Sequence, residues 1–437
     1  MSWIYFTQPN IRQQGIATLL LTALMLSIAL MVVGRSALIT RYQLADVQQE
    51  IKRSQSFWKA EGELECLWTQ ERSAYAKETL PVQCQQVKHE TRFLPPDKKL
   101  FTVTAGTTTL QKYYRLSLPD LSGVVKATSH LILTDNASFA PDPGHQLPDG
   151  RWACVVLRYK YDFSAPSVTT YHPEQLPYPL YRGFPSQTEQ RCAGQYHTVA
   201  SRAQAAKSDY LYTPTLSPFR DLFGVDVQQW FQVMSHPRIG RVPESLDNSV
   251  TGQFRYTDSS QLPVSRLNPD CATQIEDVIS HGKMIIWVYG GCVLSDPDIQ
   301  QINRVIQAKF PQQGIILLIQ DGLVGIKSQH SLQGMLYQLV TPEHAAMLFR
   351  EWASTSLQAE LKKSLARLDP EQEITSEQVS YFQSGSFYPF GGLVLDAERR
   401  FALVQGSLDF RYRRDLLIKP LSLIRPTSWR GESWYEP

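Results

Sequence analysis

The sequence predicts an α+β protein in which a long N-terminal membrane-spanning helix precedes a β-rich globular region, whose C-terminal part is β-solenoid-like or a mixed α/β sheet. Three observations lead to this prediction. Residues 16–33 carry no charge, and no proline follows them before Pro81. Twenty tyrosines, 27 prolines and 11% aromatic residues favour strands and ordered loops over a helical bundle. With 43% apolar and 19% charged residues the chain is able to bury a core, which excludes a disordered protein and a coiled-coil rod.

The uncharged stretch Ile16–Val33 is the one candidate for a membrane span. A helix of these 18 residues is about 27 Å long, close to the thickness of the hydrocarbon core, about 30 Å. Beyond the span, apolar residues recur near a 3.5-residue spacing: Leu44, Val47, Ile51, Trp58 and Trp68. The membrane helix is therefore expected to continue as an amphipathic helix to residue 72. Two helices broken at Gly34 are the alternative.

The residues around the apolar run carry a second signal. A short polar leader ends in the sequence RQQG at Gly15, the apolar run begins abruptly at Ile16, and the stretch AEGEL occupies residues 60–64. This N-terminal region resembles type IV minor pilins and pseudopilins, in particular the larger minor pilins whose first helix carries an Ala-Glu-x-x-Leu stretch. The resemblance implies that residues 1–15 form a prepilin leader, which a prepilin peptidase removes between Gly15 and Ile16.

The same resemblance implies where the chain acts and with which partners. The first helix would insert in the inner membrane as a single pass, and the globular region would lie in the periplasm or at the cell surface. Other minor and major pilins would pack on the N-terminal helix, and the prepilin peptidase and the inner-membrane platform protein would be further partners. The implied function is initiation or tip assembly of a type IV pilus or of a type II secretion pseudopilus.

Two positions depart from the usual pattern of that family. Pilins usually carry Phe directly after the cleaved glycine, where this chain has Ile16, and most carry Glu at the fifth mature position, where it has Leu20. In the family this Glu is thought to pair with the N-terminal amine of a neighbour, because a carboxylate in lipid is costly unless it is paired. The large tip pseudopilin of type II secretion also lacks it. The resemblance therefore implies that Leu20 marks a tip or initiating subunit.

Two other functions are compatible with the sequence. A signal-anchored structural or adhesive protein outside any filament would also carry Leu20, but it would not be cleaved at Gly15. An anchored periplasmic enzyme would need a polar cleft. More basic residues follow the span than precede it, so the positive-inside rule read alone would keep the C-terminal bulk in the cytoplasm. The large following region and its cysteines argue for export instead.

Six cysteines indicate disulfide bonds. They lie at Cys66, Cys84, Cys154, Cys192, Cys271 and Cys292. An even number in an exported chain is typical of a disulfide framework, whose connectivity the sequence does not fix. Pairing between sequence neighbours would join Cys66 to Cys84, Cys154 to Cys192 and Cys271 to Cys292. No CxxC motif occurs, which disfavours thiol redox chemistry and zinc binding.

We divide the globular region into a β-rich domain over residues 73–215 and a C-terminal domain over residues 216–437. The first has these strand candidates: Leu100–Ala105, Tyr113–Leu118, His130–Leu133 and Trp152–Tyr161. Residues 171–190 and 210–218, which are rich in proline and tyrosine, are expected to be loops.

Three acidic residues share one Pro- and Gly-rich stretch of the β-rich domain. Asp135, Asp142 and Asp149 would offer oxygen ligands to calcium if the loop brought them together. Their spacing matches no EF-hand. A solvated acidic loop is therefore the preferred interpretation, and no metal site is predicted.

The C-terminal domain is expected to be either a mixed α/β sheet or a β-solenoid. Its strand candidates are short and lie between glycine-containing turns: Lys283–Tyr289, Gly314–Gln320, Leu323–Ile326, Gly334–Leu339, Tyr388–Leu395, Phe401–Val404 and Leu408–Tyr412. Helices are expected over Phe219–Met234, after a cap at Ser295 or Asp296, and from Thr341 to Leu368. Successive strands would stack as coils in a solenoid, but their irregular spacing leaves the two folds undecided.

Motifs of catalysis and cofactor binding are missing from the sequence. No phosphate-binding loop, dinucleotide-binding glycine motif, HExxH or GxSxG occurs. Gly385 lies between two serines but lacks the strand–turn–helix setting of a hydrolase, and the nine histidines do not cluster at the spacing of metal ligands. The 43 basic and 41 acidic residues leave a net charge of +2, which gives no bulk electrostatic case for nucleic acid. We therefore expect neither enzymatic activity nor a cofactor, and leave nucleic acid binding open.

Overall fold

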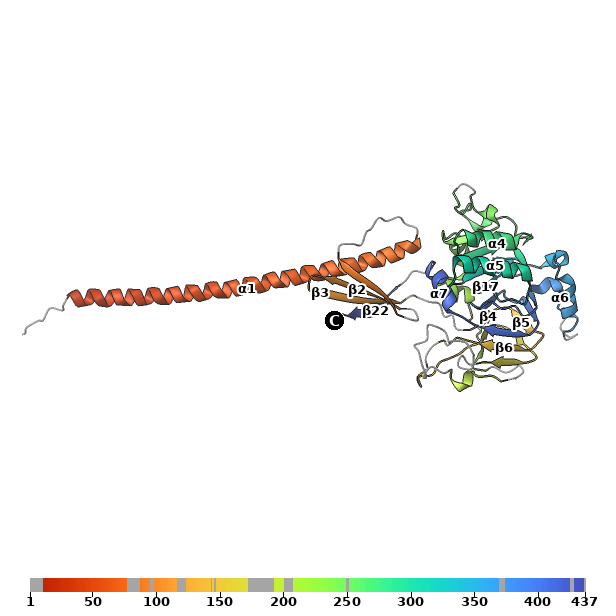
Figure 1. Cartoon of the computed structure of the whole chain (residues 1–437), viewed down its shortest axis with the longest axis horizontal. Helices are drawn as coiled ribbons and strands as arrows, with labels where there is room; N and C mark the ends of the chain where they lie inside the picture. Colours follow the sequence, from red (N-terminus) through yellow and green to blue (C-terminus); the bar gives the residue numbers. More distant parts are fainter. Residues whose placement is uncertain are drawn as a thin grey trace, which may run out of the picture.

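The computed structural model describes residues 11–76, 87–94, 98–115, 123–142, 144, 147–171, 192–199, 207–248, 251–368, 374–424 and 428–435. Within these residues a long helix projects from one side of a globular region (Figure 1). This helix, α1, runs without interruption over Ile11–Ala76, so the alternative of two helices broken at Gly34 is wrong. A lone glycine disfavours a helix by only about 1 kcal/mol relative to alanine, which is too little to break it.

The C-terminal end of α1 packs on a four-stranded antiparallel sheet. The sheet has the order β1-β2-β3-β22, with β1 at Lys88–Leu94, β2 at Lys98–Ala105, β3 at Thr108–Arg115 and β22 at Ser428–Tyr435. Ala60 and Leu64 of α1 are buried against Phe101, Val103 and Leu110 of the strands. We call α1 together with this sheet the helix–sheet unit.

The last strand of that sheet comes from the C-terminal end of the chain. β22 pairs with β3, and Ser428 lies opposite Arg115 in this antiparallel pair. Residues 116–427 are therefore an insertion between two adjacent strands of one sheet, and we call them the inserted region. Of the strands predicted nearby, Leu100–Ala105 lies within β2, and residues 113–115 end β3, whereas residues 116–118 lie outside the described residues.

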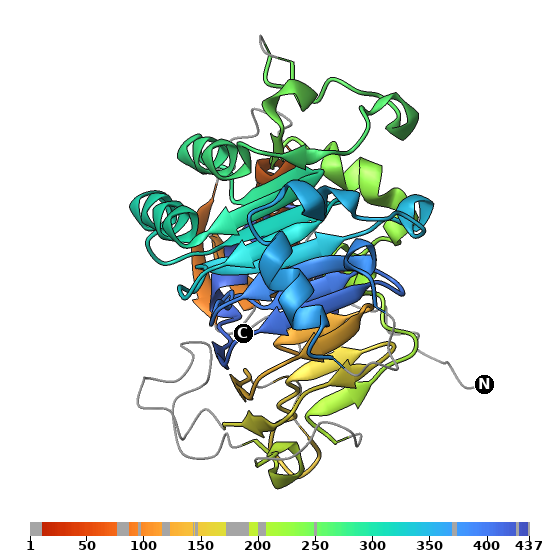
Figure 2. The same ribbon diagram turned by 90° about the vertical axis from the view of Figure 1, so that its right-hand side faces the viewer.

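The inserted region is built around three parallel sheets (Figure 2). The eight-stranded sheet contains, in spatial order, β10 (Tyr210–Tyr212), β7 (Leu157–Tyr159), β4 (Val125–Ala127), β19 (Leu393–Asp396), β17 (Gly334–Leu339), β15 (Ile315–Gln320), β13 (Ile285–Tyr289) and β11 (Ile239–Val242). The seven-stranded sheet contains β12 (Leu267–Asn268), β14 (Gly291–Ser295), β16 (Val324–Lys327), β18 (Val379–Ser384), β20 (Phe401–Gln405), β5 (His130–Leu133) and β8 (Phe163–Ser164). The three-stranded sheet contains β21 (Leu408–Arg411), β6 (Ala137–Ala140) and β9 (Val168–Thr170).

Apart from β10 and β11, strands of this region that follow one another in the chain fall in different sheets, as β13 and β14 or β15 and β16 do. The apolar side chains between the sheets form one core, to which Leu131, Val288, Ile326 and Phe410 belong. Both expected parts of the globular region, 73–215 and 216–437, contribute strands to all three sheets. The region is thus β-rich and mixed α/β, with parallel sheets, behind a long N-terminal apolar helix.

The order of the strands does not follow the chain. A first segment, residues 123–212, runs from the middle of the eight-stranded sheet at β4 to one edge at β10. A second segment, residues 239–412, begins at the opposite edge with β11 and returns until β19, β20 and β21 lie beside β4, β5 and β6. In Figure 2 the blue strands of the second segment accordingly lie against the orange and yellow strands of the first. We call this boundary the seam.

Helices cover the sheets from outside. They are α2 (Pro218–Phe223), α3 (Trp230–Met234), α4 (Cys271–Ser280), α5 (Asp296–Lys309), α6 (Gln358–Leu365) and α7 (Asp415–Ser422). Phe219 of α2 and Leu417 of α7 belong to the cluster around Trp287 on the eight-stranded sheet. Leu361 of α6 belongs to the cluster on the seven-stranded sheet. α4 and α5 face the same core as the three-stranded sheet, through buried residues such as Ile275.

The two longest predicted helices of the inserted region are wrong in part. The segment Phe219–Met234 forms two short helices, because Gly224 ends α2 in the left-handed conformation with φ of 79°. The segment Thr341–Leu368 forms 3-10 turns at Pro342–His344 and Arg350–Ser354 before α6. Its serine and threonine residues favour such local turns, as the bond from the Thr355 hydroxyl group to the carbonyl oxygen of Trp352 (2.9 Å) shows.

Other boundaries are closer to the prediction. His130–Leu133 and Gly334–Leu339 are strands as predicted, and Ser295 caps α5. The expected loop over residues 210–218 is wrong at its start, because Tyr210–Tyr212 pairs with β7 as an edge strand. The predicted strands Trp152–Tyr161 and Tyr388–Leu395 shrink to β7 and β19, since outside these strands only the isolated bridges of Trp152 with Cys192 and of Pro389 with Leu332 form.

Candidate assembly surface on the N-terminal helix

The residues predicted for leader cleavage and for a tip role lie in the first turns of α1. Gly15 and Ile16 are consecutive residues of one uninterrupted helix, and Leu20 follows one turn later. Ile16 and Leu20 are each 64% exposed. The described side chains from Thr18 to Gln55 are all exposed as well, so this part of α1 is covered by nothing in the described part of the chain.

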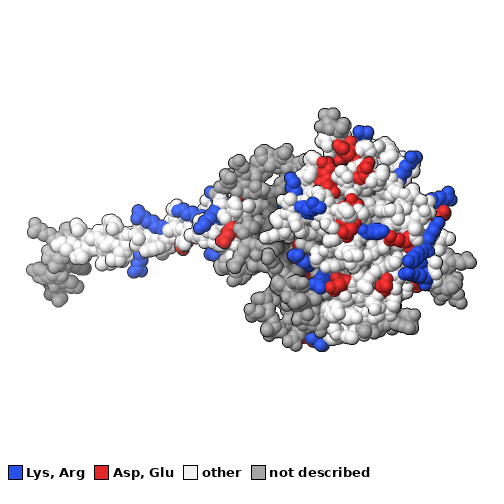
Figure 3. All heavy atoms as spheres, turned by 45° about the vertical axis from the view of Figure 1, so that its right-hand side comes forward, with Lys and Arg blue, Asp and Glu red and all other residues white. Residues whose placement is uncertain are grey.

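The exposed part of α1 has the composition of a membrane span. Among the described residues it is the one helix that is long and apolar enough to cross a membrane, with a mean hydropathy of 2.0 over its most apolar window. In Figure 3 the described N-terminal end of the helix is free of charged side chains, which begin further along. The hydroxyl groups of Thr22 and Ser27 donate to carbonyl oxygens of the same helix at 3.0 and 2.8 Å, so they would be satisfied in lipid.

A stripe of exposed apolar residues continues along α1 beyond this uncharged stretch. It consists of Leu44, Val47, Ile51 and Trp58, which are 59%, 56%, 50% and 68% exposed, and we call it the apolar stripe. Its spacing is that of a helix–helix contact. At 1.5 Å per residue even the nearest member, Leu44, lies about 17 Å beyond Val33, so a hydrocarbon layer that covers the uncharged stretch does not reach the stripe.

The AEGEL stretch at residues 60–64 fixes α1 on its sheet. Ala60 and Leu64 are fully buried. Lys112 of β3 points to the helix with only 5% of its side chain exposed, and its Nζ lies 3.0 Å from Oε1 of Glu65 and 3.9 Å from Oε1 of Glu61. Burial raises the pKa of Glu61 above its ordinary value, while Lys112 opposes that rise. The stretch thus combines apolar packing with a buried cation.

Another acidic residue of the same stretch is buried. Glu63 is 6% exposed, and its Oε1 lies 3.6 Å from Nδ1 of His89 on β1. Sequence reasoning found neither His89 nor Lys112, because both meet α1 only through the register of the sheet. The alternation of apolar residues in β2 and β3 was the one signal for that sheet.

Disulfides hold both segments of the inserted region. Cys154 is bonded to Cys192, and Cys271 at the start of α4 is bonded to Cys292 of β14, as the pairing of sequence neighbours predicts. Cys66 is disulfide-bonded too, and Cys84 lies outside the described residues. Such bonds are typical of an oxidising, extracytoplasmic compartment.

The three aspartates considered for calcium each bind a different partner. Asp135 accepts a hydrogen bond from the backbone N of Gly406 at 2.9 Å, Asp142 from the backbone N of Arg414 at 2.7 Å, and Asp149 pairs with Arg151 at 2.7 Å. No group of three or more His, Cys, Asp or Glu within the described ranges is arranged to hold a metal ion. The stretch is therefore tied to its neighbours by separate contacts.

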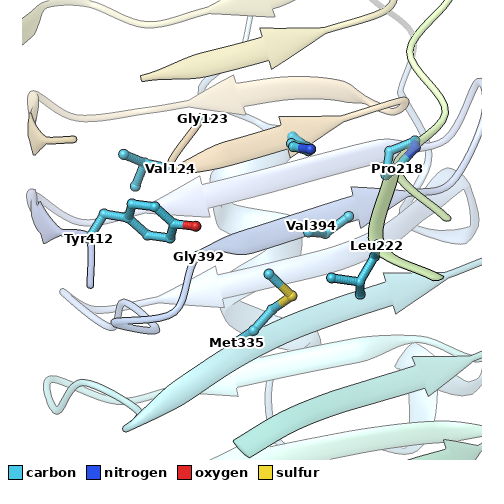
Figure 4. A pocket seen from close by; sticks show the side chains of 9 residues that line it. Gly123, Val124, Pro218, Leu222, Met335, Gly392, Val394 and Tyr412 are labelled. Atoms are coloured by element: carbon cyan, nitrogen blue, oxygen red, sulfur yellow. The ribbon is translucent and has the colours of Figure 1, made fainter. Parts of the chain in front are cut away.

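A shallow groove lies at the seam, between β4, β19 and α2 (Figure 4). Val124, Leu222, Met335, Val394 and Tyr412 form most of its lining. Lys126 also lines it, with its Nζ 3.0 Å from Oδ2 of Asp221. The free volume is about 10 Å³, room for about one water molecule, whereas small-molecule sites measure roughly 300–1,000 Å³. The groove is a packing gap rather than a ligand pocket.

No family model, curated protein or solved structure with which the chain was compared matches it.

Proposed function

We propose that this protein is a minor pilin or pseudopilin that acts in initiation or tip assembly of a type IV pilus or a type II secretion pseudopilus. α1 would first insert in the inner membrane, with the globular region in the periplasm or at the cell surface, and would later enter a filament. Its partners would be other pilins along α1, the prepilin peptidase and the inner-membrane platform protein.

The apolar stripe is the observation that carries this proposal. A protein that is merely anchored gains nothing from exposed Leu44, Val47, Ile51 and Trp58, which lie beyond the reach of the hydrocarbon layer. Exposed apolar surface of this extent favours a contact with another protein. Because the stripe has helical contact spacing, the partner that suits it is a second helix alongside α1.

The rest of the helix–sheet unit is consistent with that role. α1 keeps its N-terminal part free and packs only its C-terminal end on the sheet. Helices from several subunits are thereby able to gather in a bundle, with the sheets on its outside. Leu20 in place of the usual Glu supports a terminal position, since such a subunit has no neighbouring amine to pair with at that depth.

We further infer that the inserted region is a β-solenoid. The support is its strand order: successive strands alternate between parallel sheets, and the β13–β14 pair is followed in both sheets by the β15–β16 pair. The region lies beyond the C-terminal end of α1, away from the exposed part of the helix (Figure 1). A large region in this position suits a subunit at the end of a filament better than one within its shaft.

The N-terminus of the membrane-extracted protein tests the proposal. Mass spectrometry should find a mature start at Ile16 in cells with a prepilin peptidase and an intact Met1 in cells without it. Gly15→Leu should abolish processing, whereas Gly34→Leu, at a position on the same helix where a side chain meets no other atom within 4 Å, should leave it intact. An intact Met1 in both strains would instead support an anchored structural or adhesive protein.

A further inference from the structure

α7 is the element through which the inserted region returns to the helix–sheet unit. Its residues Leu417 and Leu421 are buried on the eight-stranded sheet. Ile418, on the same short helix, packs against the cluster that joins α1 to its own sheet. The chain then continues into β22. A change in the position of α7 would therefore alter packing in both the inserted region and the helix–sheet unit.

Within the described residues, three backbone hydrogen bonds tie the first turn of α7 to neighbouring elements. The backbone N of Arg413 donates to the carbonyl oxygen of Phe390 at 2.6 Å, and the backbone N of Gly314 donates to that of Leu416 at 3.0 Å. These two bonds join α7 and Arg413, just before it, to backbone groups of the second segment. In the third, the backbone N of Arg414 donates to Oδ2 of Asp142 at 2.7 Å, across the seam from the first segment. Only this bond ends on a group that titrates.

The surroundings of Asp142 set when it carries a charge. Its side chain is buried, and the charged groups facing it in the described part of the chain are Arg413, Arg414 and Asp415. Arg413 is itself paired with Asp415 at 2.8 Å. Burial is the largest effect and raises the pKa of Asp142 to about 7, against the lowering effect of Arg414. The carboxyl group therefore changes its charge near neutral pH.

We propose that Asp142 is a pH-responsive clamp on the first turn of α7, closed by the protonated carboxyl group and loosened when the proton is lost to water. A neutral carboxyl group accepts the N–H of Arg414 through its carbonyl oxygen and leaves no charge buried. An ionised one regains its hydration only when the turn opens. The inserted region would then gain freedom relative to the helix–sheet unit. This clamp requires only the contacts of α7 and does not rest on the pilin assignment.

The direction of the effect follows from the raised pKa. The closed turn binds the proton more tightly than the open turn, in which Asp142 is hydrated and titrates near its ordinary value. The closed state is therefore favoured most at acidic pH, and its advantage falls as the pH rises through the pKa of about 7. Opening of α7 should increase at least about tenfold between pH 5 and pH 7 and level off above that range.

Hydrogen exchange of the full chain in detergent micelles tests the clamp. Protection of the α7 amides, corrected for intrinsic exchange, should fall by that factor from pH 5 to pH 7, while β15 in the same digest stays unchanged. Asp142→Asn keeps an acceptor oxygen for Arg414 and should remove the pH dependence. Asp135→Asn is the matched control, because exposed Asp135 accepts a backbone N–H across the same seam. This variant should keep the wild-type response.

Two results would overturn the proposal. One is protection of α7 that does not change with pH in the wild-type chain, a result that stands even if the Asp142→Asn chain does not fold. The other is a folded Asp142→Asn chain whose α7 protection has the same pH dependence as the wild type.

Discussion

Lys112 is the residue on which the junction between α1 and its sheet most depends. Its ammonium group is buried between the carboxylates of Glu65 and Glu61. Lys112→Met keeps the aliphatic length but removes the buried cation that faces Glu61 and Glu65, so we expect the free energy of unfolding to fall by about 3 kcal/mol. Urea denaturation of the full chain in detergent micelles measures this change. Lys52→Met, on the exposed part of α1, should change it by less than about 0.5 kcal/mol, and equal losses in both variants would contradict the assignment.

Asp396 makes the stability of the seam depend on pH. Its carboxyl group accepts hydrogen bonds from the hydroxyl groups of Thr128 at 2.9 Å and Tyr337 at 2.7 Å. Burial nevertheless raises its pKa above the ordinary value. The folded chain thus binds the proton more tightly than the unfolded chain, so stability is greatest in acid and declines as the pH rises toward the raised pKa.

Asp396→Asn should remove that decline. The thermal midpoint of the variant minus that of the wild type should be larger at pH 8 than at pH 4. The reason is that only the wild type must bury an ionised carboxylate at the higher pH. Thermal unfolding followed by tryptophan fluorescence at several pH values measures the difference. Asp409→Asn, at an exposed position of the same seam, should differ from wild type by a constant amount. A constant difference for Asp396→Asn as well would refute the prediction.

The sequence did not predict which side chains bond to partners that are distant along the chain. Asp135 and Asp142 share one loop in the sequence, which suggested a common ligand, but each bonds a backbone N–H some 270 positions away. The sequence left the cysteine connectivity open; the structure pairs the sequence neighbours Cys154 with Cys192 and Cys271 with Cys292, and closing such short loops costs the least chain entropy. A side chain whose partner lies across a sheet depends on strand register, and no local pattern reports that register.

At the scale of single elements, local signals predicted strands better than helices. Buried parallel strands such as Ile285–Tyr289 and Ile315–Gln320 are continuous apolar runs, which the sequence displays directly. The start of α5 could be predicted from its cap, because Ser295 and Asp298 form a capping box. The helix expected from Thr341 to Leu368 is wrong because 3-10 turns, as well as α6, place the apolar residues of this segment on the same sheet. Periodicity alone does not separate these arrangements.

The apolar stripe of α1 yields a prediction for assembly. Val47→Glu places a charge in the stripe beyond the membrane span, so the variant should still insert but should be depleted at least about tenfold from sheared filament fractions. Quantitative immunoblotting of membrane and filament fractions measures both. Gln49→Glu, on the opposite side of the helix, is the matched control and should assemble like wild type. Equal recovery of the two variants in the filament fraction would argue against a helix partner at the stripe.

At the scale of the whole molecule, the insertion between β3 and β22 predicts that the two parts are separable. Arg115 and Ser428 are opposite each other in an antiparallel pair, so a two-residue Asn-Gly turn is long enough to join them. A chain with residues 116–427 replaced by this turn should keep the helix–sheet unit, because its core comes from α1, β2 and β3. Circular dichroism and protease resistance of the shortened chain check this. Rapid proteolysis of β2 and β3 would show that the unit needs the inserted region.

The order of the strands was the part of the architecture that the sequence concealed. Several strands could be found alone, yet β4 pairs with β19, which follows it by more than 260 residues. Nothing near either strand distinguishes this partner from the next strand in the chain. The pattern of short strands therefore indicated a mixed α/β sheet or a β-solenoid and left the order of the strands undetermined.

That order also decides how a mechanical load would pass through the molecule. The inserted region is attached at β4 and at α7, and both attachments lie near the middle of the eight-stranded sheet rather than at its edges. Tension applied along α1 would thus be carried by β4, α7 and the strands between them, with the seam in shear. The edge strands β10 and β11 lie outside this path, so the tension would act on the central strands of the eight-stranded sheet and not on its two edges.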